Sequence, residues 1–172
     1  KQMAYVPQDV FLFSDTVANN IRFGNSSLDQ KRIEEFAELA AVHSDINQLP
    51  EGYETAIGER GVSLSGGQKQ RLSLARAFIQ DPTILVMDDC LSAVDAATEY
   101  EIIQNLGLIM KDKTTVFITH RLNALPMFDK VIVLDEGRIV ESGSHADLVE
   151  AGGIYAEIFE QQSLEGEVKV TG

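Results

Sequence analysis

The sequence predicts an α/β fold in which the sheet is mainly parallel. Two apolar runs typical of buried strands, at 83–87 and 114–120, alternate with segments typical of helices, at 66–80 and 96–106. An Asp-Pro pair at 81–82 separates the first of these helices from the strand after it, because proline cannot continue a helix. In folds of this class, functional residues gather in the loops that follow the carboxyl ends of the strands.

Size and charge limit the classes of protein and partner. The chain has 172 residues, of which 44% are hydrophobic, and this is enough for one domain with a buried core. Its formal net charge of −13 argues against nonspecific binding of nucleic acid, because a phosphate backbone requires clustered lysine and arginine. No apolar run approaches the ~20 residues that span a bilayer, so we expect no transmembrane segment. The only cysteine is Cys90, which excludes an internal disulfide and favours a reducing compartment such as the cytoplasm.

The first part of the chain contains one clear helical pattern. Residues 1–10 are typical of a strand, and 44–62 is expected to be a loop because proline and glycine interrupt it. Between them, 29–43 carries apolar residues at the spacing of one face of a helix. That face consists of Ile33, Phe36, Ala37, Ala40 and Ala41.

The last part of the chain predicts a hairpin and two short helices. The turn residues Asp135, Glu136 and Gly137 interrupt two apolar runs between 130 and 143, as in a β-hairpin. Ser144 begins a Ser-x-x-Asp pattern that is typical of a helix start, and a final helix is expected at about 154–162. The remaining residues, 163–172, show no apolar periodicity and are expected to be a loose tail.

The stretch "LSGGQKQR" suggests a helix start that a ligand can approach. Ser65 and Gln68 have the spacing of a capping box, with Gly66 and Gly67 between them. Each glycine in the first turn costs about 1 kcal/mol relative to alanine, so two in succession favour a site where something approaches the backbone closely. A phosphate suits a helix N-terminus with exposed amides. The alternative is an ordinary helix cap with incidental glycines.

Two acids and one histidine follow the predicted strands. Asp88 and Asp89 come directly after an apolar run, where paired carboxylates hold a metal, move a proton, or do both. His120 follows the next strand, where a lone histidine is more often a structural polar group than a catalytic one. His43 and His145 have no such context, and we expect them at the surface.

Beyond these physical arguments, "LSGGQ" followed by "QRLSLARA" resembles the signature motif of ABC-transporter ATPase domains. Further motifs follow in the order of that family. The resemblance covers "VPQD" around Gln8 (Q-loop), "LFSDTVANNIRFG" and "IGERGVSLSGGQ" (exporter-like segments), "ILVMDDCLSAVD" (Walker B and D-loop), "FITHR" (switch-histidine loop), and "GSHADLV" and "GGIYAEIFEQQ" (the usual C-terminal end). The resemblance implies a P-loop NTPase-like domain over 1–162, with a helical subdomain at about 12–80.

The resemblance also implies ATP and Mg²⁺ as cofactors and assigns roles to the acids and the histidine. Asp88 corresponds to the Walker B aspartate, which helps to hold Mg²⁺ through water, together with the Q-loop glutamine Gln8. The less favoured alternative for Asp88 is a helix-capping or loop aspartate. His120 corresponds to the switch histidine that contacts the γ-phosphate. Asp95 resembles the D-loop aspartate that acts across a dimer interface, although it can also cap the helix after it.

Asp89 departs from the family pattern, which usually has a glutamate that polarises the attacking water. Aspartate is one methylene shorter, and a general base must lie within hydrogen-bond reach of its proton. We therefore expect nucleotide binding with slow hydrolysis at this site. The resemblance sharpens this prediction, because many heterodimeric ABC exporters have one weakened site.

The resemblance further implies a head-to-tail pair of ATPase domains, in which each signature loop closes on the partner's nucleotide. Ser65, Gly66, Gly67 and Gln68 would then serve a second ATPase domain, in a homodimer or, as we expect, a heterodimer. No G-x-x-x-x-G-K-[ST] phosphate loop occurs in these residues. We therefore expect a truncated domain that does not bind ATP tightly or hydrolyse it alone.

The sequence thus predicts part of an ATP-hydrolysing domain of an ABC exporter. It would work at the cytoplasmic face of a membrane, beside a transmembrane domain, with no nucleic-acid partner. Two alternatives stay open: a nucleotide-gated regulatory module with little hydrolysis, and an ABC ATPase that does not transport.

Overall fold

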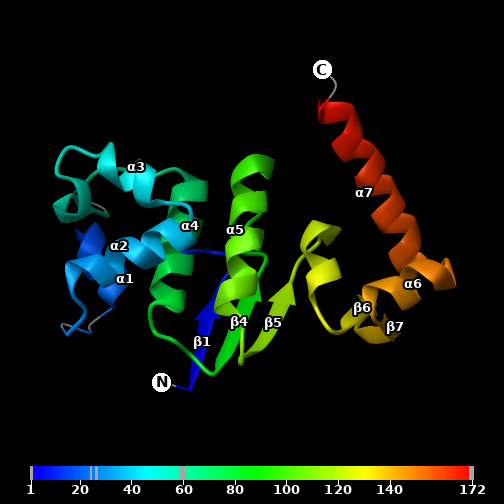
Figure 1. Ribbon diagram of the computed structural model, residues 1–172. Coiled ribbons are helices and arrows are strands. Elements are labelled where there is room, and N and C mark those ends of the chain that lie inside the picture. Colours follow the sequence, from blue (N-terminus) through cyan, green and yellow to red (C-terminus); the bar gives the residue numbers. More distant parts are fainter. Residues whose placement is uncertain (1, 24, 26, 59–60, 171–172) are drawn as a thin grey trace. The chain divides into compact units, whose positions relative to one another are not determined.

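The computed structural model describes residues 2–23, 25, 27–58 and 61–170, with side chains up to Leu164 (Figure 1). Contacts divide the chain into two compact units, one ending at Thr119 and the other beginning at His120, and each is described by itself. None of the helices in this described part combines the length and apolar character that crossing a bilayer requires.

A three-stranded parallel sheet lies within the first unit. It has the order β1-β4-β5 and consists of β1 (Met3–Val6), β4 (Ile84–Asp88) and β5 (Thr114–Ile118). The register pairs Asp88 with Ile118, so β4 and β5 end side by side. The α/β fold with a parallel sheet is therefore confirmed, and a pair of acids lies at the carboxyl end of its central strand.

The two faces of this sheet differ in exposure. Leu85 and Met87 of β4 are buried on one face. Side chains alternate between the faces of a strand, and those on the other face are exposed. Tyr5 is 52% exposed and Val116 is 46% exposed on that face. Asp88 shares the exposed face with Tyr5, because Tyr5 is in register with Val86.

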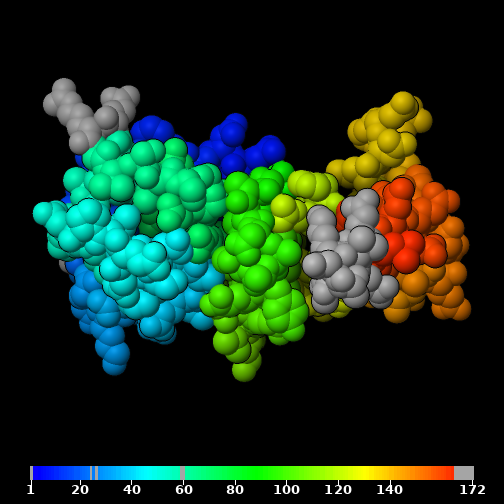
Figure 2. Space-filling view, turned by 90° about the horizontal axis from the view of Figure 1, so that it is seen from above, coloured from blue at the N-terminus to red at the C-terminus, as the bar shows by residue number. Residues whose placement is uncertain are grey.

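The rest of the first unit is mostly helical. Between β1 and β4 the described residues form α1 (Val17–Arg22), α2 (Gln30–Leu39), α3 (His43–Asn47), the 3₁₀ turn η1 (Gly52–Glu54) and α4 (Gly66–Phe78). Two short strands, β2 (Asp15–Thr16) and β3 (Ala56–Ile57), pair antiparallel, and α5 (Ala96–Ile109) follows β4. Helix α4 packs against α1, α2 and β1, and Figure 2 shows α2 and α3, in cyan, as one continuous surface.

The helix expected over 29–43 ends earlier than predicted. Helix α2 ends at Leu39, and Ala41 then adopts a left-handed φ of 52° that turns the chain into α3. The segment 44–62, expected to be a loop, therefore contains most of α3 and the turn η1. The apolar face predicted for α2 is nevertheless buried, with Ile33 fully inaccessible.

The second unit contains the predicted hairpin and helices. It consists of η2 (Leu122–Met127), β6 (Val131–Asp135), β7 (Arg138–Gly143), α6 (His145–Ala151) and α7 (Ile154–Val170). Strands β6 and β7 pair antiparallel, and Ser144 forms the expected capping box, so both predictions are confirmed. Helix α7 is longer than the expected 154–162. The segment after 162 is helical up to Val170, and its last two residues lie outside the described range. Its leucine, glutamate and lysine residues favour a helix even without an apolar face.

Candidate functional site

The residues at the end of β4 gather with the segment that follows β1. The Tyr5 hydroxyl donates a hydrogen bond to Asp88 Oδ2 at 2.9 Å, and Gln8 Nε2 donates to Asp89 Oδ2 at 3.2 Å. The hydrogen bond that the Tyr5 hydroxyl donates to Asp88 raises the pKa of Tyr5, because ionisation would remove the donated proton and leave two negative charges facing each other. The structure therefore places Gln8 against Asp89 and Tyr5 against Asp88. The sequence did not indicate Tyr5, and the functional roles of these residues stay predictions.

The backbone at Asp89 has an unusual conformation. Its φ is 43°, in the left-handed region, and its amide donates to the carbonyl of Ile118 at 2.8 Å. This backbone hydrogen bond fixes Asp89 to the end of β5. Aspartate enters the left-handed region more readily than most residues that have a side chain.

The oxygen ligands at this place fit Mg²⁺. Asp88 offers a carboxylate. Gln8 offers its amide oxygen, because the nitrogen of the same amide is the end that bonds Asp89. In the described residues, no group of three or more His, Cys, Asp or Glu could hold a metal ion by itself. Mg²⁺ does not need such a group, because it keeps several waters and is usually bound by one or two carboxylates together with phosphate oxygens.

The capping box at the start of α4 is confirmed. Ser65 Oγ accepts from the amide of Gln68 at 3.2 Å, and Gln68 Oε1 accepts from the amide of Ser65 at 2.9 Å. The other end of the Gln68 side chain is also engaged, because its Nε2 donates to Asp45 Oδ1 at 2.9 Å. The oxygen of this amide therefore closes the first turn of α4, and the nitrogen fixes that turn to α3.

Asp45 joins a second residue of α4 to α3. Its Oδ2 accepts from Arg71 at 2.8 Å, and Arg71 also donates to the carbonyl of Ala41. The Arg71 side chain is only 12% exposed and that of Asp45 is 28% exposed, so water screens this ion pair less than it would a surface pair.

The two glycines predict a close approach to the backbone at the start of α4, and another segment of the same chain makes such an approach. A Cβ placed on Gly67 would lie 2.8 Å from the carbonyl oxygen of Ala93, which is too close. A Cβ on Gly66 would meet only the Ala93 methyl group, at 3.3 Å. Gly67 is therefore required by packing between α4 and the loop after β4. A contact of these glycines with phosphate stays a prediction.

Gln70 is a site residue that the sequence argument missed. Its side chain is buried, with Nε2 donating to Ser92 Oγ at 3.0 Å and Oε1 accepting from the amide of Ala93 at 2.9 Å. Ser92 Oγ in turn donates to the carbonyl of Asp89 at 3.0 Å. Gln70 thus connects the signature helix to the loop that begins at Asp89. The available signal was a glutamine on the same helix face as Gly67 and Leu74.

Asp95 caps α5, as one of its two predicted roles requires. Its Oδ1 accepts from the amide of Thr98 at 3.1 Å, and this bond lowers the pKa of the exposed carboxyl. Its action across a dimer interface stays a prediction.

The three histidines differ from the expectations in part. His120 begins the second unit, and its carbonyl accepts from Gln162 Nε2 at 2.7 Å. The surface assignment of His43 and His145 is wrong. Both are half-buried, and each bonds through Nδ1 to a tyrosine hydroxyl, at 2.7 Å and 2.8 Å respectively.

Cys90 has no chemical role in this arrangement. The side chain is fully buried, and burial raises the pKa of its thiol to about 12. A thiol in such surroundings is inert at neutral pH, and Cys90 serves as a small packing residue.

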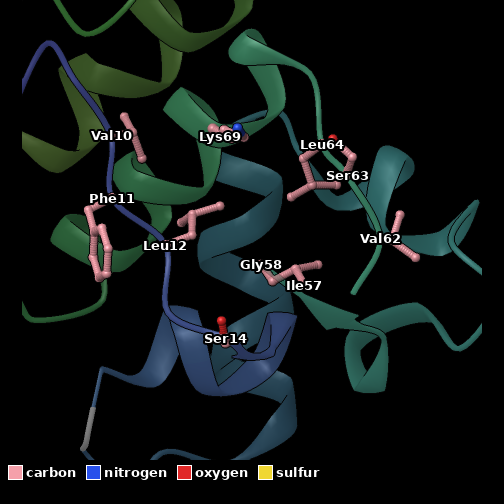
Figure 3. Close-up of a pocket in the computed structure, with 10 residues that line it drawn as sticks. All are labelled: Val10, Phe11, Leu12, Ser14, Ile57, Gly58, Val62, Ser63, Leu64 and Lys69. Carbon is pink, nitrogen blue, oxygen red and sulfur yellow. The ribbon is translucent and has the colours of Figure 1, made fainter. Parts of the chain in front are cut away.

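An open hollow of about 420 Å³ lies beside the start of α4 (Figure 3). One wall consists of residues shortly after Gln8, namely Val10, Phe11, Leu12 and Ser14. The other consists of residues that precede the signature, namely Ile57, Gly58, Val62, Ser63 and Leu64. The Lys69 side chain lies between them. The hollow therefore joins two of the exporter-like stretches and does not include the paired carboxylates.

Comparison with known proteins agrees with the motif order. Residues 1–92 match the family model of the ABC transporter. The chain is 48% identical over 164 residues to the multidrug resistance-like ATP-binding protein MdlA of Escherichia coli, covering 95% of this chain and 28% of that protein. It is 48% identical over 162 residues to YheI of Bacillus subtilis, a probable multidrug resistance ABC transporter ATP-binding/permease protein, with coverage of 94% and 28%.

A solved structure agrees as well. The structure of a bacterial Atm1-family ABC exporter with ATP bound has a TM-score of 0.86 and 41% identity, over 94% of this chain and 28% of that one. The chain thus spans 28% of the length of each of these three relatives. From the family model, the sequence identities and the shared fold, these residues belong to the ABC transporter family and correspond to part of the ATP-binding domain of its exporters.

Proposed function

We propose that these residues work within an ABC exporter, where they form part of a domain that binds and hydrolyses ATP to drive transport. The observation that carries this proposal is the arrangement at the end of β4, where Gln8 contacts Asp89 and Asp88 lies one residue before it. The high identity to exporter ATP-binding proteins supports it. We place the assembled protein at the cytoplasmic face of a membrane.

The roles of the residues follow from their chemistry. Asp88 and Gln8 would hold Mg²⁺, which neutralises charge on the phosphates when ATP is bound. Asp89 would orient and deprotonate the attacking water, and Gln8 would keep its carboxylate in place. His120 would contact the γ-phosphate. Because aspartate is one methylene shorter than glutamate, the base would be held back from the water and hydrolysis would be slow.

The other motif would serve a partner domain. In a head-to-tail pair, Ser65, Gly66 and Gly67 would meet ATP bound by the second ATPase domain, with Gln68 and Asp95 positioning the loop and the interface. We propose a heterodimer, in which the partner carries the faster base. The hollow between the segments after Gln8 and before Ser65 would receive the transmembrane domain.

A second candidate is a nucleotide-gated module that scarcely hydrolyses ATP, and Asp89 is the residue that favours it. The substitution Asp89→Glu separates the two in the assembled exporter. If Asp89 is a slow base, single-turnover hydrolysis of ATP rises by about ten- to a hundredfold, since displacement by about 1 Å costs on the order of 10²-fold.

The matched control is Asp81→Glu. Asp81 also has a left-handed φ, of 46°, but it lies on the surface and pairs with Lys113. It tests whether adding a methylene at such a backbone position changes hydrolysis without involving the site. An unchanged rate for Asp89→Glu would reject the slow-base assignment and favour the gated module.

A further inference from the structure

The segment after β5 requires a hydrogen-bond acceptor that its own residues do not provide. Helix η2 begins at Leu122, and its N-cap residue, Arg121, makes no capping bond through its side chain. An arginine side chain has no acceptor, so it cannot satisfy the first amide of a helix. Leu122 is 7% exposed, and water therefore reaches that amide poorly. The acceptor must come from elsewhere in the fold.

Gln162 of α7 provides this acceptor and a donor at the same time. Its Oε1 accepts from the amide of Leu122 at 2.9 Å, and its Nε2 donates to the carbonyl of His120 at 2.7 Å. The two backbone groups lie on either side of Arg121, so a single side chain fixes both ends of a three-residue segment. Two such bonds set the direction in which the backbone passes through His120 as well as its distance from α7.

Helix α7 is itself fixed to β7 and α6, so the position of Gln162 is fixed as well. Glu141 of β7 accepts from the amides of Ile154 and Tyr155, at 2.7 Å and 3.0 Å, and so caps the start of α7. Tyr155 is buried, and its hydroxyl bonds to His145 of α6. Gln162 lies seven residues after Tyr155, two helical turns along the same face.

We infer that Gln162 is a positioning residue that holds the backbone of His120 in the orientation needed for ATP hydrolysis. This inference rests on the proposed function, because it requires that His120 act on the γ-phosphate. Gln162 does not touch the nucleotide in this account. It acts through His120, and it makes the last helix part of the hydrolytic machinery.

The test compares Gln162→Leu with Gln161→Leu in the assembled exporter. Gln161 is the exposed neighbour on the same helix, so it controls for the loss of a glutamine from α7. We expect Gln162→Leu to lower kcat for ATP by about ten- to a hundredfold, with KM for MgATP unchanged, because misplacement of a reacting group affects the chemical step. Gln161→Leu is expected to match the wild type.

Repeating the test in a His120→Ala variant distinguishes a failure of this inference from a failure of the proposed function. There, Gln162→Leu is expected to cause no further loss, because the residue that it positions is absent. If His120→Ala leaves hydrolysis unchanged, the proposed function fails at that residue. If His120→Ala abolishes hydrolysis while Gln162→Leu behaves like Gln161→Leu, this inference is overturned and the proposed function stands. Additive losses from the two changes would also overturn it.

A second variant guards against a simple loss of folding. Gln162→Glu keeps the acceptor for the Leu122 amide but replaces the donor to His120 with an oxygen. Its melting temperature is expected to stay near that of the wild type while kcat falls. Hydrogen exchange at the Leu122 amide provides a readout independent of activity: exchange is expected to become faster in Gln162→Leu and to stay slow in Gln162→Glu. Equal exchange in all variants would contradict the inferred contact.

Discussion

The loops that follow β4 and β5 are each held by a glutamine side chain, which precedes the first loop in the sequence and follows the second. In each, a glutamine uses both ends of its amide to bind the loop. Gln70 lies 22 and 23 residues before its partners Ser92 and Ala93. Gln162 lies 42 and 40 residues after its partners His120 and Leu122.

The difference between the two lies in what surrounds the amide. The loop after β4 is also fixed by the close packing of Gly67 on Ala93, and the start of α4 is fixed by Asp45. The Gln162 contact joins two backbone groups, one of which belongs to His120, the residue of proposed catalytic importance. Damage near α4 should therefore appear mainly as lost stability, and damage at Gln162 mainly as a lost rate.

The largest expected effect on stability comes from Gln70→Leu. Leucine fills a similar volume but leaves the Ala93 amide and the Ser92 hydroxyl without their buried partner. Each of these two partly buried hydrogen bonds contributes about 0.5–1.5 kcal/mol, so we expect the free energy of unfolding to fall by about 1–3 kcal/mol. Urea unfolding of the 172-residue chain, followed by circular dichroism, measures this change.

Gln80→Leu is the matched control, two residues after the end of α4. Gln80 is half-buried, and its Nε2 donates only a long bond of 3.4 Å to the carbonyl of Arg22. Its replacement is expected to cost less than about 1 kcal/mol. Equal losses for the two variants would show that the loop after β4 does not depend on the Gln70 amide.

A smaller effect is expected from Gly67→Ala, compared with Gly66→Ala. Alanine gains about 1 kcal/mol of helix propensity at either position. At Gly67 the new methyl group would meet a backbone oxygen at 2.8 Å, so strain should exceed that gain. We expect a net loss of about 1–2 kcal/mol at Gly67 and little change at Gly66. If both alanines stabilise the chain, the packing of Ala93 on Gly67 is not tight, and phosphate contact becomes the better reason for these glycines.

The smallest effect is expected from Asp45→Asn, which removes the charge facing Arg71 but keeps an acceptor for Gln68. For this half-buried pair we expect a loss of about 1 kcal/mol, in the upper range for ion pairs near a surface. Glu35→Gln is the control, because the Arg32–Glu35 pair is exposed, with side chains 45% and 53% accessible. Its loss should be near zero. A salt titration sharpens the contrast, since the difference between the variants should persist when screening increases.

Much of the fold could be predicted from local patterns. The strand that ends in Asp88, the capping box at Ser65 and the hairpin around Gly137 each depend on residues close in sequence. The early end of α2 was not predicted, because the left-handed turn after it occurs at Ala41, and alanine has no preference for that conformation. The length of α7 was missed because the prediction relied on apolar periodicity, whereas propensity suffices for its last turns.

The site was predictable only as far as its motifs. Gln8, Asp88 and Asp89 follow two strands of a parallel sheet, and topology alone brings them together. Gln70 and Gln162 carry no local signal of their role, because their partners lie 22 or more residues away and are in part backbone groups. Which polar side chain reaches which distant amide depends on packing, which a single sequence does not contain.

The left-handed backbone at Asp89 has a consequence for how such a site changes over generations. A glutamate at φ 43° is a strained choice, whereas aspartate is among the residues that enter this region readily. Replacing the longer acid by the shorter one would therefore relieve strain, and under the role proposed for Asp89 it would also slow the chemistry. In the proposed heterodimer, where the partner would sustain turnover, selection would tolerate the slower site and the fold would gain stability. Recovery of the faster acid would then require compensation elsewhere in the loop.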